Sequence, residues 1–329
     1  MTTPAASRPE SGWIDRSDRV RIEVQGPDRA KFLHNLVTND IKKLVEGQGC
    51  EAFITTPQGK TLAYVALSAL KASTLLRSDV GESTVFLGHL QKYSIFDDVA
   101  IEEITDQTFE IHAFGRLAED IVHDAKLDGL ANADQSIAEA EWAGHSLRFV
   151  REAPAGVPGL TLIGPLAAAD SVRTALGRAS GTASLDPAVF EAMRIEAGTP
   201  ISGRDVTPNN LPQEVGRDRA TISFVKGCYL GQETVARLDA LGHVNKILKG
   251  LRIEGSTPPA PGASLVGADG KAAGTVTSAA PAIGGGAVVG LAYVRVAHAN
   301  PGTSLAVEVG GQTVAAVVAD LPMTPPAGG

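Results

Sequence analysis

One short segment holds most of the residues that could do chemistry. It runs Lys226-Gly227-Cys228-Tyr229-Leu230-Gly231-Gln232-Glu233 and combines a cation, a thiol, an amide and a carboxylate. In an extended stretch Lys226 and Cys228 would face the same side, and a nearby ammonium favours the reactive thiolate. The glycines would permit positive φ angles or close approach of a ligand to the backbone. The segment therefore predicts Cys228 as a functional thiol with Lys226 beside it.

Two other interpretations of Cys228 stay open from the residues alone. A free cysteine is often buried as a small hydrophobe, so the segment could be only a turn that leads into a helix. A Cys–His hydrolase would pair Cys228 with His243, the nearest downstream histidine. That hydrolase also needs an Asn or Asp to orient the histidine, and none is identifiable.

Composition limits the ligands and the compartment. The 329 residues have a formal net charge of -8 and no Lys/Arg cluster, so nucleic acid is not expected as the main ligand. Cys50 and Cys228 are the only cysteines. They cannot supply four ligands to an iron–sulfur cluster and form no Cys-x-x-Cys pair, so no metal site is expected. The N-terminus lacks the apolar core of a signal peptide, and no apolar run reaches the roughly 18 residues of a membrane span. We expect a cytoplasmic protein without membrane contact.

Apolar periodicity and turn residues predict an α+β protein in three units. Residues 13–107 and 182–244 are expected to form one discontinuous domain, with a strand at 20–24, a helix at 28–37 and a hairpin of strands at 50–55 and 61–67. Asp186-Pro187 predicts the start of a later helix, and Gly198 and Pro200 predict its end.

The two remaining units have different patterns. Residues 108–181 read as strand–helix–strand–strand–strand–helix, which is close to a split βαβ plan and predicts a ferredoxin-like α+β domain. Residues 245–322 hold short strands with hairpin signals at Asp269-Gly270 and Gly310-Gly311. This pattern predicts a small C-terminal β-barrel.

The segment 226–237 also resembles a family signature. It matches in full the string K-G-C-[FY]-x-G-Q-E-x-x-A-R of the YgfZ-type folate-binding proteins, which belong to the aminomethyltransferase (glycine cleavage T-protein) superfamily. Other stretches resemble that superfamily in the same order, namely Phe32–Asp40, Ala52–Lys60, Arg194–Gly198, Leu211–Glu214 and Gly274–Ser278. The likeness runs from about Trp13 to Ala297, and residues 108–181 carry little of it.

The resemblance implies a three-domain, ring-like aminomethyltransferase fold with a central pocket for tetrahydrofolate. It assigns Glu196 to the pterin, whose adjacent N–H donors a carboxylate accepts side by side. It also adds to the folate site Arg194, Tyr229, Gln232 and Arg237. Relatives support assembly or repair of iron–sulfur enzymes, and some are assigned to tRNA modification. The expected partners are therefore folate and iron–sulfur proteins or their assembly factors.

The chain departs from the true aminomethyltransferases at one position. They carry an Asp-Asp pair shortly after the glycines of the second hairpin, and its first Asp assists catalysis. The same positions here are Ala63 and Tyr64. Proton handling at the folate amine needs an ionisable group within hydrogen-bond reach. We therefore expect a folate-binding accessory protein; a folate-dependent one-carbon transferase, a tRNA-modification protein and a scaffold without ligand remain alternatives.

Overall fold

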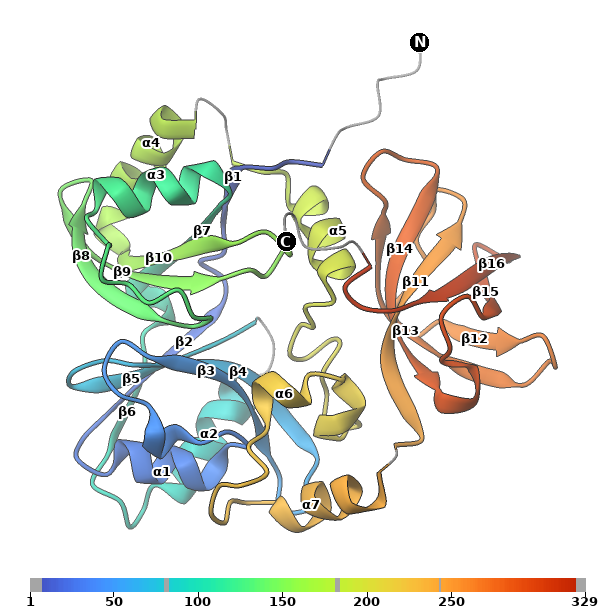
Figure 1. Cartoon of the computed structure of the whole chain (residues 1–329), viewed down its shortest axis with the longest axis horizontal. Coiled ribbons are helices and arrows are strands. Elements are labelled where there is room, and N and C mark those ends of the chain that lie inside the picture. The colour runs from blue at the N-terminus through green and yellow to red at the C-terminus, as the bar shows by residue number, and fades with distance from the viewer. Residues whose placement is uncertain (1–7, 80–82, 181–183, 243, 324–329) are drawn as a thin grey trace.

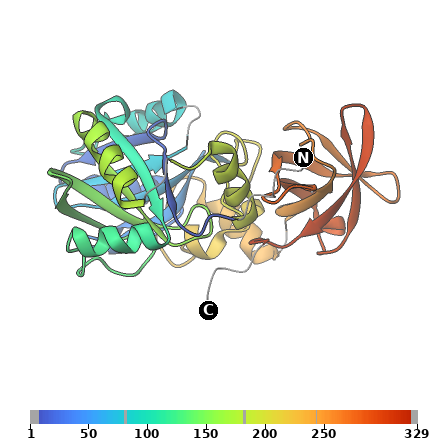
Figure 2. The ribbon, with the colours of Figure 1, turned by 90° about the horizontal axis from the view of Figure 1, so that it is seen from above.

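Two sheets and a closed barrel surround a common centre (Figure 1). Seen from above, the sheets lie at one end and the barrel at the other, with helix α5 between them (Figure 2). This computed structural model describes residues 8–79, 83–180, 184–242 and 244–323, so His243 lies outside the described residues. The α+β class and the C-terminal barrel predicted from the sequence are confirmed.

The first sheet is antiparallel and carries its helices on one face. Its strand order is β3-β4-β5-β2-β6. An apolar core that includes Phe32, Leu33 and Leu90 packs α1 and α2 against that face. The elements are β2 (Val20–Gln25), α1 (Arg29–Leu36), β3 (Gly49–Thr55), β4 (Thr61–Ala69), β5 (Ser73–Ser78), α2 (Ser83–Tyr93) and β6 (Ala100–Glu103).

The second sheet is also antiparallel, with the order β1-β7-β10-β9-β8. Helices α3 and α4 pack on its outer face over a core that includes Phe109, Leu117 and Val172. Its elements are β1 (Gly12–Asp15), β7 (Thr108–Phe114), α3 (Arg116–Asp124), β8 (Ile137–Trp142), β9 (His145–Glu152), β10 (Gly159–Pro165) and α4 (Ala169–Ser180).

Two details of the predicted domains are wrong. Residues 13–15 were placed with the first domain, but β1 pairs with β7 of the second sheet; four residues are too few to show a pattern that fixes their partner. Residues 108–181 are not a split βαβ unit, because β7 and β8 run antiparallel with two strands between them. Short hairpins make β8, β9 and β10 a meander, and its last strand pairs with β7.

A connecting segment and the barrel complete the fold. Helix α5 begins after Asp186, whose side chain accepts from the Ala188 amide at 2.8 Å, and ends at Gly198 with a φ of 75°. Both ends are as predicted. The barrel order is β11-β14-β13-β12-β15-β16. The elements are α5 (Pro187–Ala197), α6 (Asp218–Thr221), α7 (Gln232–Leu241), β11 (Lys246–Glu254), β12 (Ser264–Gly267), β13 (Ala272–Pro281), β14 (Ala287–Arg295), β15 (Ser304–Val309) and β16 (Gln312–Ala319).

A single buried carboxylate, that of Asp205, ties the barrel to α5. It accepts from Arg194 Nη1 at 2.9 Å and from the hydroxyls of Thr277 and Ser278 at 2.5 and 2.6 Å. The Asp205 side chain is fully buried, and its backbone carbonyl accepts from the Tyr293 hydroxyl at 2.9 Å. These contacts fix where the barrel sits relative to the central cavity.

Replacing Asp205 with Asn should lower the free energy of unfolding by about 3 kcal/mol, because the buried guanidinium of Arg194 loses the fully buried one of its two carboxylate partners. Urea denaturation followed by circular dichroism measures this loss. The control is Asp170→Asn, whose side chain is 98% exposed. An Asp205→Asn protein as stable as the control variant would show that the barrel is held mainly by apolar packing.

Candidate functional site

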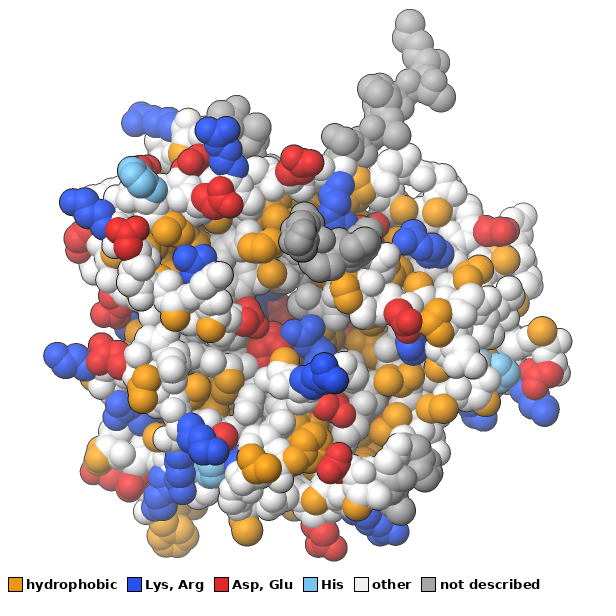
Figure 3. All heavy atoms as spheres, in the orientation of Figure 1, with side chains coloured by type: hydrophobic (Ala, Val, Ile, Leu, Met, Phe, Trp, Pro, Cys, Tyr) orange, Lys and Arg blue, Asp and Glu red, His pale blue; other side chains and the backbone are white. Residues whose placement is uncertain are grey.

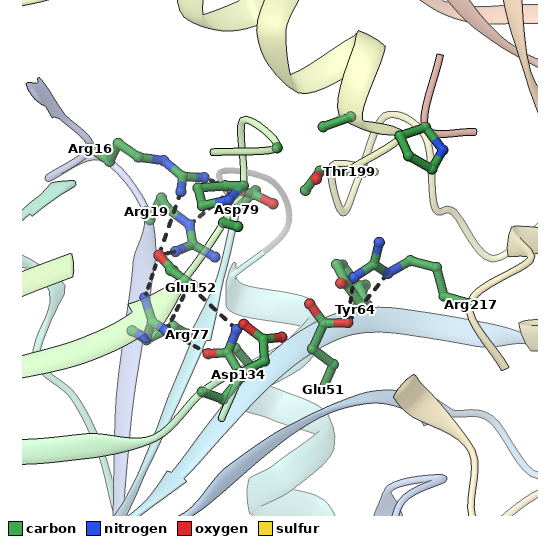
Figure 4. A pocket seen from close by; sticks show the side chains of 17 residues that line it. Arg16, Arg19, Glu51, Tyr64, Arg77, Asp79, Asp134, Glu152, Thr199 and Arg217 are labelled. Carbon is green, nitrogen blue, oxygen red and sulfur yellow. Dashed lines mark hydrogen bonds and ion pairs between the residues drawn. The ribbon is translucent and has the colours of Figure 1, made fainter. Parts of the chain in front are cut away.

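A cavity of about 370 Å³ lies where the two sheets face each other, near the end of α5. The space-filling view shows a recess at the centre of the molecule with acidic and basic side chains inside it (Figure 3). Residues from both sheets and from the segments after α5 form its walls (Figure 4). The walls are rich in charge: four arginines and four carboxylates line the cavity, namely Arg16, Arg19, Arg77, Arg217, Glu51, Asp79, Asp134 and Glu152.

One wall is a buried ion-pair network. Arg16 Nη2 and Arg19 Nε donate to Asp79 Oδ1 at 3.0 and 2.9 Å. Arg77 Nη2 donates to Glu152 Oε2 at 2.9 Å. Burial works to raise the pKa of Glu152, but the charges of Arg77 and Arg19 outweigh it and hold that pKa well below its usual value. These carboxylates are therefore ionised at neutral pH and already paired within the protein.

The opposite wall centres on Tyr64 of β4. The guanidinium of Arg217 lies 5.7 Å from the centre of the Tyr64 ring and donates from Nη2 to Glu51 Oε2 at 2.6 Å. Burial, first of all, raises the pKa of Tyr64 well above its usual value, so the phenol stays neutral. Next to this group Asp134 projects into the cavity (Figure 4), and burial followed by the charges of Glu51 and Glu152 raises its pKa to about 6.

Glu196 lies beside the cavity rather than in its lining. Glu196 is 7% exposed, and its neighbour Ala197 lines the cavity. The Glu196 carboxylate pairs with Arg8, which also donates to the Ala155 carbonyl at 3.0 Å. A ligand that is to contact Glu196 must therefore displace Arg8.

Arg194 does not face the cavity. Its guanidinium donates to Glu191 from Nε and Nη2, and to Asp205 and the Thr199 carbonyl from Nη1. Four of its five N–H groups are thus used inside the protein. We predicted a folate contact for Arg194; its position instead explains how α5 is joined to the barrel.

Strand β4 contains no Asp or Glu, so no alignment of this strand with the aminomethyltransferases supplies the catalytic acid. Ala63 is 3% exposed and packs with the α1 core, whereas the neighbouring Tyr64 and Ala66 face the cavity. A slip of one residue in comparing this strand with the aminomethyltransferases would exchange Ala63 for Tyr64, and neither is an acid. The neighbouring strand β3 does supply a cavity-lining acid, Glu51, whose Cα is paired with that of Ala66.

The signature segment clamps α1 to the β3–β4 hairpin. Lys226 Nζ donates to the carbonyls of His34, Val37 and Asn39 at 2.6, 2.6 and 2.8 Å. Gly231 has a φ of 82°, and a Cβ there would lie 2.8 Å from Gly59 Cα in the hairpin turn. The Leu230 amide donates to the Asn35 carbonyl at 2.9 Å. The Gly231 position therefore does require glycine, as the sequence suggested.

The prediction that Lys226 acts on the Cys228 thiol is wrong. An ammonium group has three donors, and the three carbonyls at the end of α1 take all of them. Burial lowers the pKa of Lys226 to about 7. Lys226 is buried, whereas Cys228 is exposed.

Cys228 lies in a different place from the cavity. It lines a groove with Phe32 and Leu36 of α1, and this groove shares no lining residue with the cavity. Since α1 covers one face of the first sheet and Tyr64 faces the other way, the sheet separates the thiol from the cavity. We expected Cys228 at the cavity mouth, and that expectation is wrong.

Three further residues of the predicted folate site also fall outside the cavity lining. Tyr229 is 8% exposed, lines the Cys228 groove and lies under the Lys226 ammonium, which is 4.7 Å from its ring centre. Gln232 begins α7, and Arg237 is exposed on that helix. The structure therefore brings Tyr229 together with Cys228 and does not bring these three residues together with Glu196.

Several cavity residues were missed by sequence reasoning. Asp134 and Gln135 lie in a turn before β8, in the region that carries little family likeness, and Arg217 lies in an irregular segment before α6. Gln135 is 3% exposed with a φ of 62°, which is rare for a residue other than glycine. No periodic or turn signal in the sequence marks these positions.

Comparison with known proteins places the chain in a family. The GCVT N-terminal domain matches residues 4–224, and the glycine cleavage T-protein C-terminal barrel domain matches residues 246–324. The fold and these matches define an aminomethyltransferase-like protein. The chain belongs to the glycine cleavage T-protein family.

Individual relatives agree with this assignment. One relative is a chloroplastic protein of Arabidopsis thaliana that is provisionally named a transferase. It is 30% identical over 94% of this chain and 70% of its own length. An aminomethyltransferase of Chlorobium chlorochromatii is 26% identical over 96% of this chain and 88% of its own. The crystal structure of aminomethyltransferase T from Bartonella henselae has the same fold, with a TM-score of 0.85 at 23% identity over 97% of this chain and 88% of that one.

No helix in the described part of the chain is long and apolar enough to cross a membrane.

Replacing Lys226 with Met should lower the free energy of unfolding by about 2 kcal/mol, because the carbonyls at the end of α1 lose a buried charged donor. Chemical denaturation measures the change, with the exposed Lys71→Met as the control. If Lys226→Met is as stable as Lys71→Met, the three carbonyl contacts do not hold α1 and the clamp is incorrectly assigned.

Proposed function

We propose that this protein binds reduced folate in the central cavity and serves as a YgfZ-type accessory protein of iron–sulfur enzymes. The observation that carries this proposal is a charged central cavity in a T-protein-family chain whose β4 strand has no carboxylate, combined with the full signature at 226–237. The β4 composition argues against aminomethyl transfer, since the proton-handling acid is missing there.

The donor set of the cavity suits a pterin ring. Tyr64 with Arg217 gives a flat aromatic and cationic surface, and the cavity volume is of the size that accepts a bicyclic heterocycle. Carboxylates near this surface can accept N–H groups: Glu51, Asp134 and, once Arg8 releases it, Glu196. When bound, reduced folate would supply a carrier for one-carbon units; the side chains named here would orient and hold it.

Cys228 is the thiol best placed to act on a partner. It is exposed, whereas burial raises the pKa of the other cysteine, Cys50, to about 12 and keeps that thiol protonated. Because the first sheet lies between Cys228 and the cavity, a reactant for the thiol approaches from outside the molecule. This arrangement supports work on a partner protein rather than on the bound folate.

Folate binding is tested by calorimetry of tetrahydrofolate with the full chain under anaerobic conditions. We expect saturable binding at one site per chain. Adding a methylamine donor should give no methylene-tetrahydrofolate beyond the level without protein. Sustained formation of methylene-tetrahydrofolate would favour the one-carbon transferase, and no binding at high micromolar folate would favour the scaffold without ligand.

The thiol role is tested in cells that lack the protein. Wild type and Cys50→Ala should restore the activity of iron–sulfur enzymes, and Cys228→Ser should restore less than about a tenth of it, since a hydroxyl is a far weaker nucleophile and metal ligand than a thiolate. Protein levels measured by immunoblotting control for folding. Full restoration by Cys228→Ser would remove the thiol from the proposed function.

A further inference from the structure

The four carboxylates that line the cavity differ in how well they are paired. Asp79 and Glu152 accept from arginines of the ion-pair network. Glu51 accepts from Arg217 through Oε2. Asp134 forms no ion pair with any residue that the structure describes; only the more distant charge of Arg217 and a hydrogen bond with Gln135 lower its pKa. Asp134 is therefore the lining acid with free acceptor capacity.

Asp134 and Glu51 reach the same part of the cavity from different sheets. Glu51 comes from β3 of the first sheet, and Asp134 from the turn before β8 of the second. Both side chains project into the cavity beside Tyr64 (Figure 4). Glu51 is buried, whereas Asp134 is exposed to solvent, so the pair lies where the cavity opens outward. Two carboxylates at one place repel each other unless a donor lies between them.

The turn that carries Asp134 is held in a strained shape. Gln135 keeps its positive φ because Arg77 Nη2 donates to its side-chain oxygen at 2.8 Å and its amide donates to the Arg151 carbonyl at 2.8 Å. On the other side, Gly49 permits close approach, since a Cβ there would lie 2.2 Å from the Gln135 carbonyl oxygen. Contacts from both sheets thus fix Asp134 where no ion pair neutralises its charge, and such stored strain is typical of binding sites.

Glu196 offers a poorer acceptor in this chain. Its carboxylate is already paired with Arg8 and does not line the cavity. The Asp134–Glu51 pair, in contrast, lies next to the flat surface of Tyr64 and Arg217, where a planar ring can stack.

We propose that Asp134, together with Glu51, accepts the adjacent N–H groups of a planar 2-amino-4-oxo heterocycle in the central cavity, in place of Glu196. This inference rests on the proposed function for the identity of the ligand as folate. It assigns a specific edge of that ligand to residues on the wall opposite the arginine network.

Binding through Asp134 is also pH-dependent. The charged groups that face its carboxylate are Glu51 on β3, Glu152 on β9 and Arg217 before α6. An N–H edge needs the ionised carboxylate, so affinity should rise as pH increases through about 6, the pKa of Asp134 in the free protein. The same raised pKa means that ionised Asp134 destabilises the free fold. Asp134→Asn should therefore melt at a higher temperature than wild type at pH 7.5, and this difference should shrink below about pH 6 and disappear only below about pH 4, near the usual pKa of Asp.

The test is calorimetry of the full chain with tetrahydrofolate and with 6-methyltetrahydropterin, which keeps the ring and lacks the tail. At pH 7.5 we expect Asp134→Asn to weaken binding of both ligands at least about 10-fold. The amide removes the negative charge and puts its NH₂ group where a carboxylate oxygen would accept an N–H of the ring. Glu51→Gln should weaken it by a smaller factor, and Glu196→Gln by less than about 2-fold. The control is Asp128→Asn, because Asp128 is exposed and lies in the same α3–β8 loop as Asp134. Wild-type affinity should fall about 10-fold between pH 7.5 and pH 5, whereas that of Asp134→Asn should not change.

Loss of binding in Glu196→Gln with normal binding in Asp134→Asn would overturn the inference and assign the N–H edge to Glu196. Failure of the methylpterin to bind wild type would overturn it as well. Binding of the methylpterin without binding of tetrahydrofolate would count against the proposed function alone. Thermal melting separates these results from misfolding, since the Asp134→Asn protein is expected to be the more stable one.

Discussion

The buried ion-pair network between the two sheets is the constraint on which the cavity depends. Arg19, Arg77 and Glu110 are at most 8% exposed, and they face one another across the gap between the sheets. Removing charged groups from water costs free energy unless each keeps its hydrogen bonds. The two sheets therefore cannot pack directly against each other here, as they would across an apolar core. The network holds the sheets together through pairing while keeping the space between them polar. The cavity is the part of this polar space between the sheets that protein atoms do not fill.

The first sheet can serve two sites because successive residues of a strand face opposite sides. On β4, Ala63 and Val65 pack against α1, and Tyr64 and Ala66 face the cavity. On the α1 side the signature segment with its thiol packs against α1, and the cavity face carries the polar groups. A shift of one residue in register would exchange these two sets, so the hairpin turn at Gly59, against which Gly231 packs, fixes which set faces the cavity.

The sequence was sufficient where local signals decide the structure. Asp186 and Gly198 bound α5 because capping depends on neighbouring residues, and the turns at Gly270 and Gly310-Gly311 indicated barrel hairpins for the same reason. It was insufficient where long-range packing decides. The partner of β1, the direction of the Lys226 ammonium and the place of Cys228 depend on which elements meet in space. Asp134 could not be found at all, because it reaches the cavity through a strained turn at Gln135 that only contacts from both sheets can hold.

The cavity and the thiol are separate in space, yet one hairpin contacts both. Strand β3 carries Glu51 on the cavity side, and its last residue, Thr55, donates from its hydroxyl to the Leu230 carbonyl of the signature segment at 2.5 Å. The Thr38 hydroxyl, at the end of α1, in turn accepts from the Phe53 amide at 2.9 Å. Hydrogen bonds therefore join the hairpin to the two elements that form the Cys228 groove. A ligand that contacts Glu51 acts on the same strand that positions the loop of Cys228, so the β3–β4 hairpin is a continuous hydrogen-bonded connection between the cavity and that loop.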